Sequence, residues 1–155
     1  MTDAERLQHA LDLAYRHLGR RDRTVAEVRG HLAAHGVDPE IAGDVVAELG
    51  RQGYLDDARY ARRFAADRRT IDAWGSERIE TRLLAAGVPG ELIVPALAER
   101  DAAEELEAAV AVLRRRFARP VGDRYRQRAL GMLVRKGYEL ELAYDAVRAF
   151  EREAA

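Results

Sequence analysis

Apolar residues recur along the chain at the three- and four-residue spacing that is typical of amphipathic helices. The pattern repeats itself, because residues 28–49, 79–100 and 129–150 align without gaps, each with a glycine between two apolar stretches. Gly36, Gly87 and Gly137 coincide in this alignment, and a leucine lies four residues before each of them. Glycine commonly ends a helix in the left-handed conformation, which penalises any residue with a β-carbon. Each segment therefore predicts a helix, a tight turn and a second helix.

A further helix is predicted before each of these pairs. Its apolar residues keep one internal spacing in the first and last copies, with a weaker counterpart in the middle copy: Leu7, Leu11, Ala14 and Leu18; Leu106, Val110, Leu113 and Phe117; Tyr60, Ala61 and Phe64. No long alternating run of β-branched residues predicts a strand. We therefore predict an all-α fold of three tandem three-helix repeats, at residues 1–57, 58–103 and 104–155. Because one such repeat buries little surface alone, the repeats should pack on their neighbours in an elongated, curved array.

Composition agrees with a folded helical protein and excludes several other classes. The 155 residues are 48% hydrophobic and 34% charged, which is typical of a folded chain and not of a disordered one. The absence of cysteine excludes disulfide scaffolds and thiolate metal sites. The polar N-terminus lacks a signal-peptide core, and no apolar run is long enough to span a membrane. We expect a cytoplasmic protein without membrane contact.

Charge is distributed unevenly, although the formal net charge is only −1. The first repeat is acidic, whereas arginines are concentrated at 59–69 and 114–128, and every basic residue except Lys136 is arginine. The forked guanidinium group suits contact with carboxylates and phosphates. The candidate partner-binding residues are Arg59, Arg62, Arg63, Arg69, Arg115, Arg119, Arg126 and Arg128. A solvated helix face, or a general bias towards arginine, remains an alternative explanation of both clusters.

The stretch GYLDD, Gly53–Asp57, lies between the first two repeats and is interpreted as a structural motif. Gly53 ends one helix, and Tyr54 and Leu55 are expected to be apolar anchors. Asp56 suits the N-cap of the next helix, where Asp57 adds a favourable negative charge. Catalytic carboxylates instead need to be held apart across a substrate, which adjacent residues at a turn do not achieve.

The rest of the sequence contains no pattern typical of a catalytic or metal-binding site, so we expect no catalytic residue, no metal and no cofactor. His31 and His35 are four residues apart on a predicted helix, but a third zinc ligand is lacking. A solvated helix face is the simpler interpretation of this pair.

The motif GYLDDARYA, following the pattern L…G…I…V…L, resembles the signature of the RecX family of bacterial regulators of the RecA recombinase. The patterns RI…L…G…I…AL at 78–97 and L…RKGY…A…V at 133–147 resemble the second and third repeats of that family. The resemblance covers residues 7–150. It implies a non-enzymatic regulator that binds in the groove of the RecA–single-stranded-DNA filament and inhibits its recombinase, ATPase and co-protease activities. The implied partners are the RecA filament and single-stranded DNA, the implied processes are recombinational DNA repair and the SOS response, and we expect a monomer.

A nucleic-acid-binding helical module that acts directly on DNA is the alternative. Three-helix units resemble helix-turn-helix folds, in which a recognition helix reads base edges. The third helices predicted here, DPEIAGDVVAEL and PGELIVPALAE, are acidic or apolar, which argues against sequence-specific binding. Non-specific binding of single strands, with a steep dependence on salt, remains open.

Overall fold

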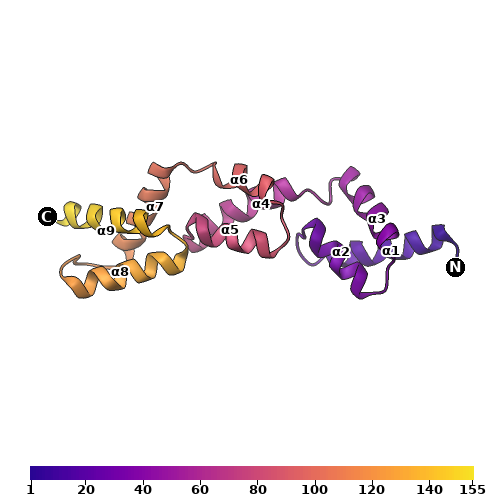
Figure 1. Ribbon diagram of the computed structural model, residues 1–155, viewed down its shortest axis with the longest axis horizontal. Helices are drawn as coiled ribbons and strands as arrows, with labels where there is room; N and C mark the ends of the chain where they lie inside the picture. The colour runs from indigo at the N-terminus through magenta and orange to yellow at the C-terminus, as the bar shows by residue number, and fades with distance from the viewer. The chain divides into compact units, whose positions relative to one another are not determined.

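The computed structural model describes all 155 residues, and it contains α-helices and one π-helical turn but no strand (Figure 1). The prediction of an all-α fold is therefore confirmed. In chain order the elements are α1 (Asp3–Leu18), α2 (Val25–Ala34), α3 (Pro39–Arg51), α4 (Asp57–Asp67), η1 (Arg68–Asp72), α5 (Ser76–Ala85), α6 (Gly90–Leu97), α7 (Ala102–Arg116), α8 (Asp123–Lys136) and α9 (Leu140–Ala154).

The chain folds into two compact units. The first comprises Met1–Ala61 with Leu83–Ile93, and the second comprises Arg62–Arg82 with Val94–Ala155. Segments of the middle repeat contribute to both units. The repeat boundaries at 57/58 and 103/104 therefore stay a prediction.

In the first unit, α1, α2 and α3 bury their apolar faces against one another. The core includes Ala14, Val28, Leu32, Val45 and Leu49, all of which are fully buried. A capping box begins α2, since the Thr24 hydroxyl accepts from the Glu27 N–H at 3.1 Å and the Glu27 carboxylate accepts from the Thr24 N–H at 3.0 Å. These contacts satisfy backbone N–H groups at the start of α2 and fix where the helix begins.

In the second unit, α7, α8 and α9 form the corresponding core. Its central side chains include Leu113, Leu133 and Val147, together with the fully buried Tyr138. The Tyr138 hydroxyl donates to the Ala73 carbonyl at 2.8 Å, so the segment that precedes α5 is joined to this core. Burial is the main reason that the pKa of Tyr138 is raised.

Gly36, Gly87 and Gly137 follow the ends of α2, α5 and α8 with φ of 76°, 84° and 100°. The predicted left-handed turn after each helix is therefore confirmed. Two of these glycines also lie at close contacts. A β-carbon on Gly87 would lie 2.3 Å from Cβ of Ala26, whereas one on Gly36 would meet nothing within 4 Å. Glycine is thus required at Gly87 by space as well as by backbone conformation.

Gly137 is packed even more closely within the second unit. A β-carbon there would lie 2.3 Å from Cβ and 2.6 Å from the backbone nitrogen of Arg78. Two backbone hydrogen bonds cross the same contact, from the Gly75 N–H to the Lys136 carbonyl at 2.8 Å and from the Glu77 N–H to the Gly137 carbonyl at 2.9 Å. The turn after α8 therefore fixes the N-terminus of α5.

Candidate partner-binding surface

The C-terminal arginine cluster occupies the end of α7, the following loop and the start of α8. Asp101 and Glu104 form a capping box at the start of α7, and three arginines occupy its last turn, where the helix dipole favours cations. Phe117 then leaves the helix with φ of −122° and ψ of 123°. Gly122, with φ of 90°, precedes α8. The arginines of this region are consequently spread over two helix ends and a loop.

Two arginines of the cluster are held by carboxylates of the same unit. Arg114 bonds to Glu107 at 2.8 Å and also to Glu153. Nε of Arg126 donates to Glu151 at 2.7 Å. Hydrogen bonds to these carboxylates raise the pKa of both guanidinium groups. The predicted contact residue Arg126 is thus exposed but already paired.

Arg116 and Arg128 of the cluster, together with Arg135 further along α8, line an open hollow of about 520 Å³. We call it the α7–α8 groove, and its lining residues are Arg116, Phe117, Gln127, Arg128, Met132 and Arg135. The guanidinium carbons of Arg116 and Arg128 lie 5.9 and 5.6 Å from the centre of the Phe117 ring, which are cation–π distances. No carboxylate lines the groove. Its lining therefore combines the positive charges of arginines with the apolar side chains of Phe117 and Met132.

Arg115 and Arg119 lie outside the groove on the same part of the chain. Both are exposed, and neither forms a hydrogen bond or an ion pair within the chain. Together with Arg128 they are the members of the predicted set with the least intramolecular engagement. An exposed guanidinium group without an internal partner can bind a phosphate or carboxylate of another molecule without breaking a contact within the chain.

Arg128 was among the predicted contact residues, and Arg116 lay in the arginine-rich stretch 114–128 without being chosen from it, whereas Arg135 was not predicted. Arg128, Met132 and Arg135 are spaced i, i+4, i+7 on α8, so their common face could have been found from the sequence. That Arg116 lies beside these residues is harder to predict from the sequence, because it depends on how the end of α7 packs near α8.

The arginines of α4 have more internal contacts than the C-terminal cluster. Nη2 of Arg59 donates to the Gly53 carbonyl at 2.6 Å, which binds the start of α4 to the turn that precedes it. Arg62 lies 3.9 Å from Glu99, and both side chains remain about half exposed. Arg63 is exposed. Exposed pairs of this kind contribute about 0–1 kcal/mol, so a partner could displace the Arg62 pair at low cost.

Arg69 has a structural position in the second unit. Its Nη2 donates to the Ser76 hydroxyl at 3.0 Å and to the Leu97 carbonyl at 3.1 Å, while its Nε is buried without an acceptor. Burial, followed by the nearby charge of Arg100, lowers the pKa of Arg69. These contacts join η1 to α5 and α6, so a role of Arg69 in partner binding would require this guanidinium to leave internal acceptors.

The Gly53–Asp57 segment forms the junction between α3 and α4. Gly53 has φ of 80°, and Leu55 is buried. Oδ1 of Asp56 accepts from the Arg59 N–H at 3.0 Å, which is an N-cap contact at the start of α4. Tyr54 differs from the apolar anchor that we expected, because it is 57% exposed.

Asp57 has a contact that the sequence did not reveal. Its Oδ1 accepts from the N–H of Val25, the first residue of α2, at 3.0 Å. One carboxylate therefore lies at the starts of two helices, α2 and α4. This contact explains the adjacent aspartates structurally, since each carboxylate satisfies a different backbone N–H.

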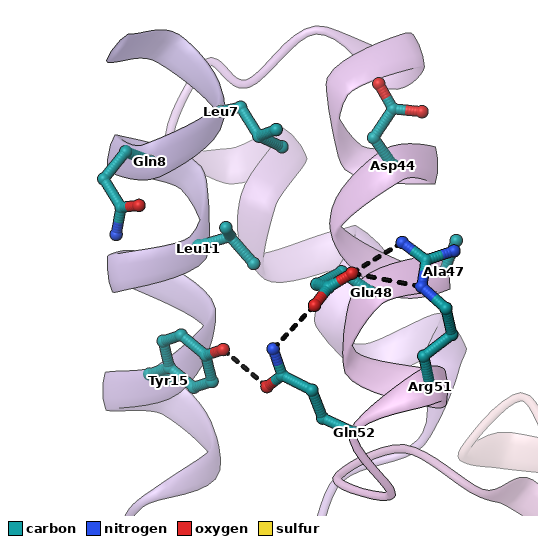
Figure 2. A pocket seen from close by; sticks show the side chains of 9 residues that line it. All are labelled: Leu7, Gln8, Leu11, Tyr15, Asp44, Ala47, Glu48, Arg51 and Gln52. Carbon is teal, nitrogen blue, oxygen red and sulfur yellow. Dashed lines mark hydrogen bonds and ion pairs between the residues drawn. The ribbon is translucent and has the colours of Figure 1, made fainter. Parts of the chain in front are cut away.

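A second hollow, of about 490 Å³, lies between α1 and α3 in the first unit (Figure 2). Four of its polar side chains form one network, in which Glu48 accepts from Arg51 at 2.6 Å and from Gln52 at 2.8 Å. The Tyr15 hydroxyl donates to Gln52 at 2.6 Å. Asp44 adds another carboxylate to this wall, so the hollow does not suit an anionic partner.

Comparison with known proteins identifies the family. The family models described as RecX, first, second and third three-helix domains match residues 10–49, 56–97 and 103–147. The chain belongs to the RecX family. Among similar proteins named regulatory protein RecX, that of Mycobacterium avium is 31% identical over 152 residues, covering 96% of this chain and 88% of the relative. That of Trichlorobacter lovleyi is 37% identical over 134 residues, covering 83% and 87%.

Solved structures support the fold of a RecX-family chain. The crystal structure of RecX from Lactobacillus salivarius has a TM-score of 0.84 and 17% identity, covering 96% of this chain and 99% of that one. A second crystal structure of a regulatory protein RecX has a TM-score of 0.76 and 21% identity. The three-helix repeats predicted from the glycine pattern are therefore those of a known fold. No helix of the chain is both long and apolar enough to cross a membrane.

Proposed function

We propose that this RecX-family chain binds in the groove of a RecA–single-stranded-DNA filament and inhibits its recombinase, ATPase and co-protease activities. It thereby modulates recombinational DNA repair and the SOS response. In this proposal the chain acts by binding, as a cytoplasmic monomer without a cofactor or a catalytic step. Membership of a family of regulatory proteins supports the proposal at the level of the protein class.

The α7–α8 groove is the observation that indicates which residues bind the filament in this proposal. Its arginines face no carboxylate, in contrast to Arg114 and Arg126, which are paired with glutamates. A recombinase filament on single-stranded DNA presents phosphates together with acidic protein surface. Guanidinium groups bind both kinds of anion through paired N–H donors, and the exposed Arg62 and Arg63 of α4 extend the set of candidates.

The test is co-sedimentation of the chain with RecA filaments, assembled on single-stranded DNA with an ATP analogue. We expect the chain to sediment with the filament, and the ATPase rate of the filament to fall as the chain is added. Free RecA without DNA or nucleotide is the control. A chain that stays in the supernatant, or that sediments without lowering the ATPase rate, would contradict the proposal.

Direct binding to single-stranded DNA is a second candidate, favoured by the contact of Arg116 and Arg128 with an aromatic ring in the groove. Nucleic-acid-binding surfaces combine cationic groups with aromatic side chains on which bases stack. This candidate predicts binding to an oligonucleotide without RecA, with an affinity that falls steeply as salt rises. The filament proposal instead predicts that RecA strengthens binding at the same salt concentration.

A further inference from the structure

Three histidines gather in the first unit, remote in sequence from the α7–α8 groove. The rings of His17 on α1 and His31 on α2 are stacked, with centroids 3.8 Å apart and an interplanar angle of 8°. The His35 ring lies 4.4 Å from that of His31. From the sequence, His31 and His35 were expected to be a solvated pair, and His17 was not grouped with them because it lies on a different helix. No group of three or more His, Cys, Asp or Glu side chains is arranged to hold a metal ion.

The three rings border a small hollow of about 150 Å³, which we call the His–Arg hollow. Its lining residues are Leu13, Arg16, His17, Arg20, His31 and His35. Since one water molecule occupies about 30 Å³ of liquid, this space admits one tetrahedral oxyanion. None of the lining residues is acidic, and no residue of α3 lines the hollow. Arg16 and Arg20 are exposed, so their guanidinium groups can turn towards an anion.

Arg16 and Arg20 have almost no internal acceptor. Nε of Arg16 reaches only the Asp12 carbonyl, at 3.4 Å, and Arg20 forms no side-chain hydrogen bond or ion pair. Of the charged groups in the adjoining loop, Arg21 is paired with Glu27 at 2.8 Å, and Arg23 contacts the His17 carbonyl at 3.4 Å. The lining of the hollow therefore carries two arginines and no carboxylate, and the nearby Glu27 is paired with Arg21.

The surroundings of His17 and His31 disfavour the protonated form of each ring. Burial lowers the pKa of His17, and the charges of His31, Arg23 and Arg21 lower it further, against a smaller opposite effect of Glu27. The pKa of His31 is lowered mainly by burial. The charges of His35, Arg23 and Arg20 lower it further. Two stacked rings 3.8 Å apart would repel each other if both were charged. An anion in the hollow would reverse this balance by favouring the protonated rings.

One hydrogen bond determines which ring nitrogen of His35 carries a proton. Its Nδ1 lies 2.9 Å from the His31 carbonyl oxygen, which can only accept, so Nδ1 carries the proton. In the neutral ring Nε2 is then a lone-pair acceptor, which repels an anion. Protonation converts Nε2 into a donor.

We propose that the His–Arg hollow is a phosphate-binding site, in which Arg16 and Arg20 attract the anion and the histidines take up protons as it binds. The phosphate group can come from a free phosphate compound or from a nucleic-acid backbone. An anion whose charge is constant over this range should bind more tightly at pH 5.5 than at pH 7.5, because an anion that binds with proton uptake gains affinity as protons become more available. The site is separate from the groove of the proposed function and does not depend on it.

Sulfate is the first probe, because it is tetrahedral and keeps its charge over this pH range. Ring signals of the histidines are followed by NMR while sulfate is added to the full chain at constant ionic strength. We expect saturable shifts for His17, His31 and His35 but not for His9, which does not line the hollow. Affinity should rise at least about tenfold from pH 7.5 to pH 5.5, which corresponds to an average uptake of about half a proton over this range.

The double variant Arg16→Ala, Arg20→Ala should weaken sulfate binding at least about tenfold, whereas Arg29→Ala on α2 should leave it unchanged. Both variants alter exposed side chains, and circular dichroism verifies their fold. An oligothymidylate that displaces sulfate and shifts the same rings identifies a nucleic-acid backbone as the source. Inorganic phosphate that does so when the oligonucleotide does not identifies a free phosphate compound. Absence of saturable shifts in the three rings, or equal affinity at both pH values, would overturn the proposal, whatever the result with RecA filaments.

Discussion

Replacement of Gly137 by alanine should destabilise the second unit far more than the same change at Gly36. Both glycines end a helix with positive φ, so both substitutions place an alanine in an unfavourable backbone conformation. Only at Gly137 would the new β-carbon collide with another part of the chain, the Cβ and backbone nitrogen of Arg78. The pair therefore separates the cost of backbone conformation from the cost of the contact.

The expected magnitudes follow from these two costs. A residue with a β-carbon in the left-handed region costs about 1–2 kcal/mol, and the lower entropy of the unfolded alanine chain offsets about 0.4–1 kcal/mol, so Gly36→Ala should cost about 1 kcal/mol. At Gly137, steric overpacking adds about 1–3 kcal/mol. Displacement of the backbone also weakens the hydrogen bonds from Gly75 and Glu77, each with a net contribution of about 0.5–1.5 kcal/mol. We expect about 3–5 kcal/mol in total at Gly137.

The measurement is urea unfolding of both variants, followed by circular dichroism at 222 nm and, for the second unit, by fluorescence of Trp74. The Trp74 transition should move to lower urea in Gly137→Ala and hardly move in Gly36→Ala. Equal losses of unfolding free energy in the two variants would refute the reasoning, because they would mean that backbone conformation alone determines the cost and that the close contact at Gly137 contributes nothing.

Three further substitutions test individual contacts through the free energy of unfolding. Asp56→Ala removes the acceptor of the Arg59 N–H and should cost about 1 kcal/mol, and an unchanged value would show that the cap is unimportant. Tyr138→Phe should also cost about 1 kcal/mol because its hydroxyl donates to Ala73, whereas Tyr125→Phe should cost nothing or stabilise, because that hydroxyl is buried without a partner. Burial raises the pKa of Tyr125 to about 12 from 10.0, so the folded state holds this proton more tightly than the unfolded state does. The free energy of unfolding should therefore fall as pH rises from 10 to 12, and it should fall less steeply in Tyr125→Phe.

The elements of the fold could be predicted because they depend on short-range patterns. Leu32, Leu83 and Leu133, each four residues before a turn glycine, are fully buried as their helical periodicity indicates. The contact of Gly75 with Gly137 could not be predicted in this way. It depends on the mutual approach of helices that are far apart in sequence, which no local pattern encodes.

The candidate surface was less predictable, because sequence shows where charge is but not what neutralises it. Arg126 and its partner Glu151 are 25 residues apart, and only the packing of α8 on α9 brings them together. Arg69 belongs to an arginine-rich stretch, yet its side chain faces internal acceptors. Tyr54 is exposed where an apolar anchor was expected, since its ring lies edge-on to Tyr15 at 5.8 Å instead of entering the core.

The most direct test of the proposed function measures filament binding by a triple variant of the α7–α8 region, Arg115→Glu, Arg119→Glu, Arg128→Glu. Arg126 is left intact, because a glutamate there would face Glu151. The control variant, Arg6→Glu, Arg29→Glu, Arg152→Glu, changes the net charge equally at exposed positions outside the groove. We predict that the first variant loses at least about tenfold in affinity for RecA filaments with an unchanged helical spectrum, and that the control binds nearly as the natural chain does. Equal losses in both variants, or no loss in the first, would contradict the assignment of the exposed arginines at 115–128 as the binding surface.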